Sequence, residues 1–162
     1  MLFDLLRDGF SVDLIINLLS RVFVVFCILP IHEFAHAWVA DRLGDDTARL
    51  KGRLTIAPMA HIDLMGALLI FLAGFGYAKP VPVNPRRFKN PRKGMALTAL
   101  AGPASYLVMA FFFIILQKIF WYLYDANQMA VVFYVSSMFF FYAATVNVSL
   151  AVSSPSFVAI RA

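Results

Sequence analysis

The stretch VFVVFCILPIHEFAH, residues 22 to 36, decides how the whole chain is interpreted. Its first ten residues carry no charge and no hydroxyl group, and three ionisable side chains, His32, Glu33 and His36, then follow within five positions. Ionisable groups are costly inside an apolar environment, so their presence here favours a functional role. Pro30 lacks a backbone donor and predicts a kink in the helix just before His32.

The composition is that of a membrane protein of one domain. The chain has 162 residues, of which 62% are hydrophobic and 14% charged, whereas soluble domains are about 25% charged. The net charge of +5 is concentrated in RRFKNPRK, residues 86 to 93, which contains no acid. In a membrane protein we expect Arg86–Lys93 to face anionic lipid or to fix the topology. Aromatic residues do not alternate with these cations, so we expect no nucleic-acid partner.

The apolar segments predict an all-α integral membrane protein with three or four membrane segments. Residues 14 to 40 form a long apolar pattern, and residues 95–117 and 128–152 are each long enough to span a bilayer. The N-terminus lacks the small-residue cleavage site of a signal peptide, so the first membrane helix is expected to be retained. The single cysteine, Cys27, rules out an intramolecular disulfide and a Cys2His2 zinc site.

A short β-like or re-entrant stretch is expected after the first helix. RLTIAPMAHID, residues 53 to 63, has the pattern of an extended strand or hairpin arm. The apolar segment at 64–77 has only 14 residues, fewer than the roughly 20 that a span needs. The loops before and after it, residues 41–55 and 79–93, are both basic, and the positive-inside tendency prefers them on one side. We therefore expect residues 64–77 not to cross the membrane completely.

The spacing of HEFAH indicates metal chemistry. His32 and His36, four residues apart, lie on one face of a helix, one turn from each other, so two imidazoles can bind one ion. Glu33 is rotated by about 100° from His32 and stands beside that ion, where it can act as a general base. This is the HExxH pattern of zinc-dependent hydrolysis, which also arises by chance as two surface histidines in soluble proteins. A zinc ion would offset the desolvation of the cluster, and the apolar surroundings suggest a membrane-embedded substrate.

The chain resembles the site-2 protease family of intramembrane zinc metalloproteases, most closely its compact prokaryotic group. HEFAH matches the HExxH of the family, LGDDTARLKGRLTIAPMAHIDLMG at 43–66 resembles the segment that follows it, and GYAKPVPVNPRRFKNPRKGMALTALAGP at 76–103 resembles the proline loop and the next helix. The resemblance implies Zn2+ on His32 and His36 with Glu33 as base. It also implies cleavage of membrane-embedded protein substrates in or near transmembrane helices, in a prokaryotic cytoplasmic membrane.

Two departures from the family pattern stand out. The third zinc ligand of the family is an Asp in a later Asp-Gly pair, but no acid follows Asp125 here, and SSPSFVAIRA at 153–162 does not fit the family. We therefore expect residues 1–162 to be a single metalloprotease-like domain, C-terminally incomplete through a frameshift or truncation. The helix with AGP often continues to an Asn in the family, where AGPASY places Tyr106. His61 and Asp63 are candidates for a substitute ligand or for orienting a ligand histidine.

Several alternatives stay open. Lys79, Pro80 and Pro82 either line a substrate path, since extended backbone can pair with an unwound substrate, or form a plain interfacial loop. Asn147 either hydrogen-bonds between helices or lies near the site. For the whole chain, the alternatives to proteolysis are an inactive pseudoprotease or fragment that binds membrane helices without cleaving them, and an ion or zinc transporter.

Overall fold

The protein is described by a computed structural model that covers residues 11–61, 63, 65–66, 68–69, 79–127 and 131–153. Throughout these residues the regular structure is helical, and no strand occurs among them. Three helical stretches in this part of the chain are long and apolar enough to cross a membrane: Val12–Arg42, Pro91–Ala126 and Val131–Ser153. The prediction of an all-α membrane protein with several membrane segments is confirmed.

The first stretch consists of three consecutive helical pieces. Helix α2 (Val12–Phe23) continues into the π-helical segment η1 (Val24–Ile28) and then into α3 (Leu29–Arg42). The π-helical turn lies immediately before Pro30, whose missing N–H interrupts the regular ladder of hydrogen bonds. The disturbance expected at the proline therefore takes the form of a wider helical turn. At the other end α3 closes at Gly44, which adopts a φ of 108° that glycine tolerates well.

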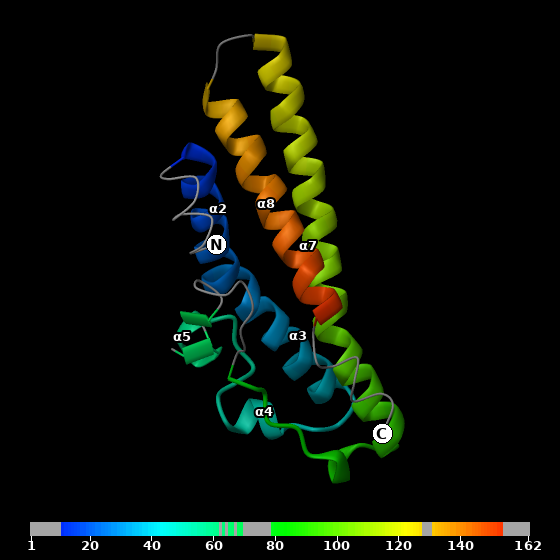
Figure 1. Cartoon of the computed structure of the whole chain (residues 1–162). Coiled ribbons are helices and arrows are strands. Elements are labelled where there is room, and N and C mark those ends of the chain that lie inside the picture. The colour runs from blue at the N-terminus through cyan, green and yellow to red at the C-terminus, as the bar shows by residue number, and fades with distance from the viewer. Residues whose placement is uncertain are drawn as a thin grey trace.

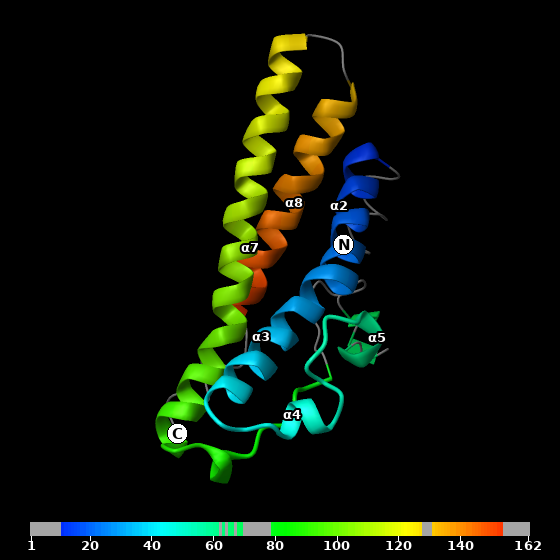
Figure 2. The same ribbon diagram turned by 180° about the vertical axis from the view of Figure 1, so that it is seen from behind.

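Helices α7 (Pro91–Asn127) and α8 (Val131–Ser153) lie side by side along most of their length and run in opposite directions (Figures 1 and 2). Helix α7 has 37 residues and extends well beyond the expected span of 95–117. At 1.5 Å per residue it is about 55 Å long, against a hydrocarbon core of about 30 Å. Part of α7 must therefore project beyond the apolar layer of a membrane.

Helix α7 also supports the first stretch. Helix α3 packs against α7, and α2 packs against α8. Buried positions recur every four residues along α7, at Gly94, Thr98, Gly102, Tyr106 and Ala110. Neighbouring members of this row lie one turn apart, and the row winds slowly around α7, by about 40° per step. The core that the long helices share contains Val24, Ile28, Leu29, Tyr106, Phe113, Ala143, Ala144 and Ala151.

The stretch after α3 differs from the expected β-like conformation. Residues 53–57 are irregular and α5 (Pro58–His61) is a single helical turn. The fixed φ of proline suits the first turn of a helix, which explains why the segment turns at Pro58 and does not extend. Of the expected re-entrant segment, residues 65–66 and 68–69 are helical. The rest of residues 64–77 lies outside the described residues, so its path stays a prediction.

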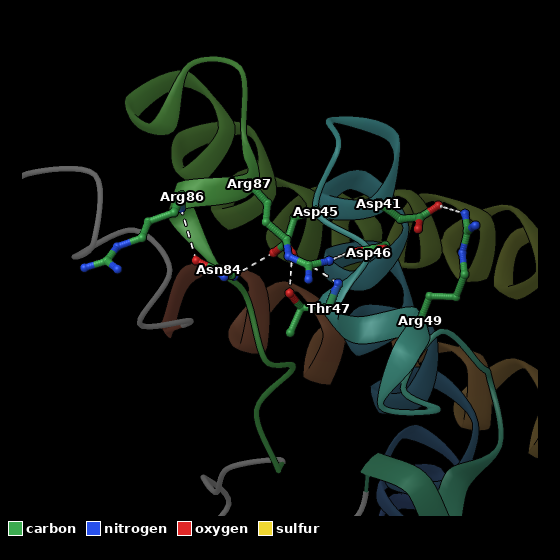
Figure 3. A network of polar contacts seen from close by, with 8 residues as sticks. All are labelled: Asp41, Asp45, Asp46, Thr47, Arg49, Asn84, Arg86 and Arg87. Carbon is green, nitrogen blue, oxygen red and sulfur yellow. Dashed lines mark hydrogen bonds and ion pairs between the residues drawn. The ribbon is translucent and has the colours of Figure 1, made fainter.

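Polar contacts join the loop after α3 to the loop before α7 (Figure 3). The buried carboxylate of Asp45 accepts hydrogen bonds from the backbone N–H of Asn84, at 2.6 Å, and from the backbone N–H of Thr47, at 3.1 Å. Asp46 forms an ion pair with Arg87. These contacts surround the short helices α4 (Thr47–Leu50) and η2 (Pro85–Arg87). The network fixes the proline loop, at Asn84 and Arg87, against the residues that follow the C-terminal end of α3.

Candidate active site

The two histidines of HEFAH face each other on consecutive turns of α3. Nε2 of His32 lies 3.1 Å from Nε2 of His36, and the two rings are perpendicular with centroids 4.6 Å apart. Glu33 lies beside them, with Oε1 3.9 Å from Nε2 of His32. His32 and Glu33 are 6% and 7% exposed, respectively. The arrangement therefore brings two imidazole nitrogens and one carboxylate together at a position largely shielded from solvent.

The separation of the two Nε2 atoms fits a shared metal ion. Two imidazole nitrogens bound to one tetrahedral zinc at 2.0–2.1 Å lie about 3.3 Å apart. The observed 3.1 Å is close to this value, and it also lies within the range of a direct hydrogen bond between the two rings. Neutral imidazole is a normal zinc ligand, and a carboxylate next to the ion is the usual base. Zinc fits the residues that are present.

A hydrogen bond from α3 to α7 fixes the ring of His36. Its Nδ1 lies 2.6 Å from the backbone carbonyl oxygen of Thr98. A carbonyl oxygen only accepts, so Nδ1 carries the proton and donates it. In the neutral ring, Nε2 is then unprotonated and its lone pair is available toward His32. Hydrogen bonds of this kind commonly fix the tautomer of a metal-ligating histidine.

Gly102 and Tyr106 support the histidines, and sequence reasoning missed this role. A methyl group at Gly102 would overlap the rings of both His36 and His32. One turn further along α7, the ring of Tyr106 stacks on His32 with centroids 4.1 Å apart. The signal in the sequence is the four-residue spacing of Thr98, Gly102 and Tyr106, which places all three on the buried face of α7.

The proline loop lies beside Glu33. The carboxylate of Glu33 interacts with the backbone of Val81 and with the charge of Arg53. Nη2 of Arg53 also donates to the carbonyl oxygens of Lys79, at 3.5 Å, and Pro80, at 3.3 Å. Arg53, which sequence reasoning also missed, is therefore hydrogen-bonded to the extended stretch at residues 79–84 and acts on the candidate base only through its charge.

His61 and Asp63 have partners of their own. Nε2 of His61 donates to the carbonyl oxygen of Thr55 at 2.7 Å, and its backbone carbonyl accepts from the N–H of Lys79 at 2.9 Å. Burial, and secondarily the charge of Arg53, lowers the pKa of His61 below its ordinary value. Asp63 accepts from the backbone N–H of Gly66 at 3.0 Å.

No group of three or more histidine, cysteine, aspartate or glutamate side chains able to hold a metal is found within the residues that the structure covers. Neither His61 nor Asp63 therefore completes such a set with the histidine pair. Asn147 is fully buried in α8, and its Nδ2 donates to the carbonyl of Ala143 within the same helix at 2.8 Å. This bond is local and joins no second helix.

Part of the chain is similar to two curated bacterial proteins. Over 80 residues it is 55% identical to "Putative zinc metalloprotease YwhC" of Bacillus subtilis (strain 168), which covers 49% of this chain and 36% of that protein. Over 98 residues it is 33% identical to "Putative zinc metalloprotease Rip2" of Mycolicibacterium smegmatis (strain ATCC 700084 / mc(2)155), which covers 57% of this chain and 38% of that protein. The chain thus matches little more than a third of the length of either relative. No family model matches the chain, and no solved structure does.

The helical fold and these similarities agree on one class of protein. The resemblance to zinc metalloproteases is confirmed by two relatives that bear that description. Together with three helices able to cross a membrane, they are consistent with a member of the site-2 protease family.

Proposed function

We propose that this chain carries the histidine ligands and the general base of an intramembrane zinc metalloprotease. The observation that supports this most strongly is the 3.1 Å separation of the two Nε2 atoms, with Glu33 next to them, on a helix long and apolar enough to cross a membrane. Isolated ionisable groups at such a position are rare unless they have a function.

Each residue has a distinct role in this proposal. His32 and His36 hold Zn2+, which when bound polarises a substrate carbonyl and lowers the pKa of a water molecule. Glu33 takes a proton from the attacking water and then passes it to the leaving amine. Thr98 orients His36 through its carbonyl oxygen. The apolar helices around the site exclude bulk water and so strengthen the electrostatic interactions within it.

The substrate class follows from the proline loop. A transmembrane helix must be unwound locally before it is cleaved, because its carbonyls are engaged in hydrogen bonds. Lys79, Pro80 and Pro82 belong to a non-helical stretch, and its Val81 lies against the candidate base. We propose that this stretch guides an unwound segment of a membrane-embedded protein to Glu33.

The basic cluster suggests the orientation and the lipid partner. Arg86 and Lys89 are exposed just before α7, and Arg92 and Lys93 are exposed in its first turn. Anionic headgroups attract such clusters. We propose that they contact anionic lipid on the inner side of a prokaryotic cytoplasmic membrane.

An inactive pseudoprotease is the second candidate, and one observation favours it. No third metal-ligating side chain joins the histidine pair within the described part of the chain. Such a protein would bind zinc weakly and retain membrane helices without cleaving them. A zinc or ion transporter has less support, because α8 carries no charged or histidine side chain along its length.

Cleavage of a reporter with one transmembrane helix, reconstituted in liposomes with zinc, tests the proposal. Glu33→Gln should lower cleavage by about 10²–10⁴-fold and leave zinc binding in place. Asp63→Asn, which removes a neighbouring carboxylate outside the histidine pair, is the control and should cleave normally. Cleavage that survives Glu33→Gln would refute the mechanism. Zinc binding by the unaltered chain without any cleavage would favour the pseudoprotease.

A further inference from the structure

The ring of Tyr106 lies nearly flat on the imidazole of His32. The two centroids are 4.1 Å apart and the planes differ by 24°. Aromatic pairs in proteins usually have centroids 4.5–7 Å apart, so this contact is close. Tyr106 is 3% exposed, and its position on the inner face of α7 leaves its ring little freedom to move away.

The two histidines are held in different ways. His36 donates a hydrogen bond to the Thr98 carbonyl, which fixes both its tautomer and its orientation. His32 lies beside the backbone of Gly102. Its buried Nδ1 has no hydrogen-bond partner of normal geometry among the described residues. The orientation of the His32 ring therefore depends on what its faces and edges touch.

Those contacts confine the His32 ring on two sides. The face of Tyr106 covers one side, and the perpendicular ring of His36 meets it on another. Gly102 makes the approach possible, because any side chain there would occupy the space of both imidazoles. Rotation of the His32 ring about its Cβ–Cγ bond would drive a ring edge into Tyr106.

We infer that Tyr106 is a positioning residue that acts through His32 and raises the affinity of the histidine pair for zinc. Its flat aromatic face, and not its hydroxyl group, holds Nε2 of His32 toward Nε2 of His36. The inference rests on the proposed function, since it assigns the histidine pair to zinc. It is specific to an aromatic residue at position 106, because an aliphatic side chain of comparable size offers no flat surface.

The test measures metal affinity and does not depend on cleavage. Zn2+ is titrated into the purified full chain in lipid nanodiscs against a competing chelator, and Co2+ absorption reports the ligand geometry. Tyr106→Phe should bind zinc as the unaltered chain does and give the same Co2+ spectrum. Tyr106→Leu should weaken zinc binding by about 10–100-fold, the usual effect of losing a contact that orients a ligand, and change the Co2+ spectrum.

Phe113→Leu is the matched control. Phe113 lies on the same buried face of α7, is 2% exposed and stacks on Phe140 with centroids 5.9 Å apart. Its loss should cost comparable packing energy but leave zinc affinity unchanged. Should Tyr106→Leu fail to fold, Tyr106→Met replaces it, since methionine has about the same volume as leucine but adapts its shape to irregular space, again without a flat ring.

The inference would be overturned if Tyr106→Leu or Tyr106→Met bound zinc as tightly as the unaltered chain. It would also be overturned if Tyr106→Phe bound zinc as weakly as Tyr106→Leu, or if Phe113→Leu lost as much zinc affinity as Tyr106→Leu. Failure of the proposed function looks different. In that case the unaltered chain binds no zinc, or binds it equally well after His32→Ala and His36→Ala.

Discussion

Nε2 of His32 lies 3.1 Å from Nε2 of His36, and each ring is held there by a different residue of α7. Helix α3 supplies the side chains of the candidate site. Helix α7 supplies the carbonyl oxygen of Thr98, the close approach at Gly102 and the aromatic face of Tyr106. The position of the pair therefore depends on the close packing of these two helices.

Substitution at Gly102 should damage the pair without removing either histidine. A Cβ there would overlap both imidazoles, and overpacking of this kind costs about 1–3 kcal/mol. We expect Gly102→Ala to weaken zinc binding by about 10–100-fold, as measured by chelator competition. Gly94→Ala is the control, because its Cβ would meet the side chain of Phe88 in the loop before α7, away from the histidines. Equal zinc affinity in the two variants would contradict the close approach at Gly102.

Loss of Asp45 should release the proline loop. Its buried carboxylate accepts from the N–H of Asn84 and of Thr47, and an unpaired buried donor costs about 1–3 kcal/mol. We expect Asp45→Ala to speed amide hydrogen exchange in the segment that contains Asn84. Asp41→Ala removes an ion pair with the exposed Arg49 (Figure 3) that involves neither Asn84 nor Thr47, and should change exchange in that segment little. Unchanged protection in Asp45→Ala would show that the loop is held by other contacts.

Protonation of His61 should loosen the contact between α5 and the proline loop. The pKa of His61 is lowered in the folded chain by burial and by the charge of Arg53, so the unfolded chain binds its proton more readily. The stability that depends on neutral His61 is therefore present above the ordinary pKa of about 6.5 and is lost as the pH falls below it.

The amide of Lys79 reports this change, because it donates to the carbonyl of His61. Its exchange, corrected for the intrinsic effect of pH, should speed up between pH 7 and pH 5. His61→Gln keeps a side-chain donor for the Thr55 carbonyl but does not titrate. In this variant the corrected exchange rate of the Lys79 amide should therefore not rise between pH 7 and pH 5. The same pH dependence in both proteins would rule out His61 as the cause.

The sequence predicts the elements that depend on local chemistry. Long apolar runs indicate the three long helices, and the spacing of His32 and His36 places both on one helix face. The prediction of a β-like conformation is wrong for the described part of residues 53–63. A segment so short contains little periodic information, and Pro58 favours the start of a helix. The length of α7 is underestimated, because its polar and aromatic end resembles a membrane interface but continues the helix.

The parts of the site that come from pairing of helices could not be predicted. Thr98, Gly102 and Tyr106 form a regular buried stripe, but such a stripe equally indicates ordinary packing until its partner is known. The contact of Asp45 with Asn84 joins positions 39 residues apart. Nothing in the local sequence fixes how two irregular loops meet.

The most direct test of the central claim is X-ray absorption at the zinc edge of the full chain loaded with zinc in lipid nanodiscs. Two imidazole nitrogens are expected at about 2.0–2.1 Å from the metal, with loss of one imidazole in either His32→Ala or His36→Ala. A zinc environment that is unchanged in both variants, or the absence of imidazole scattering in the unaltered chain, would contradict the central claim.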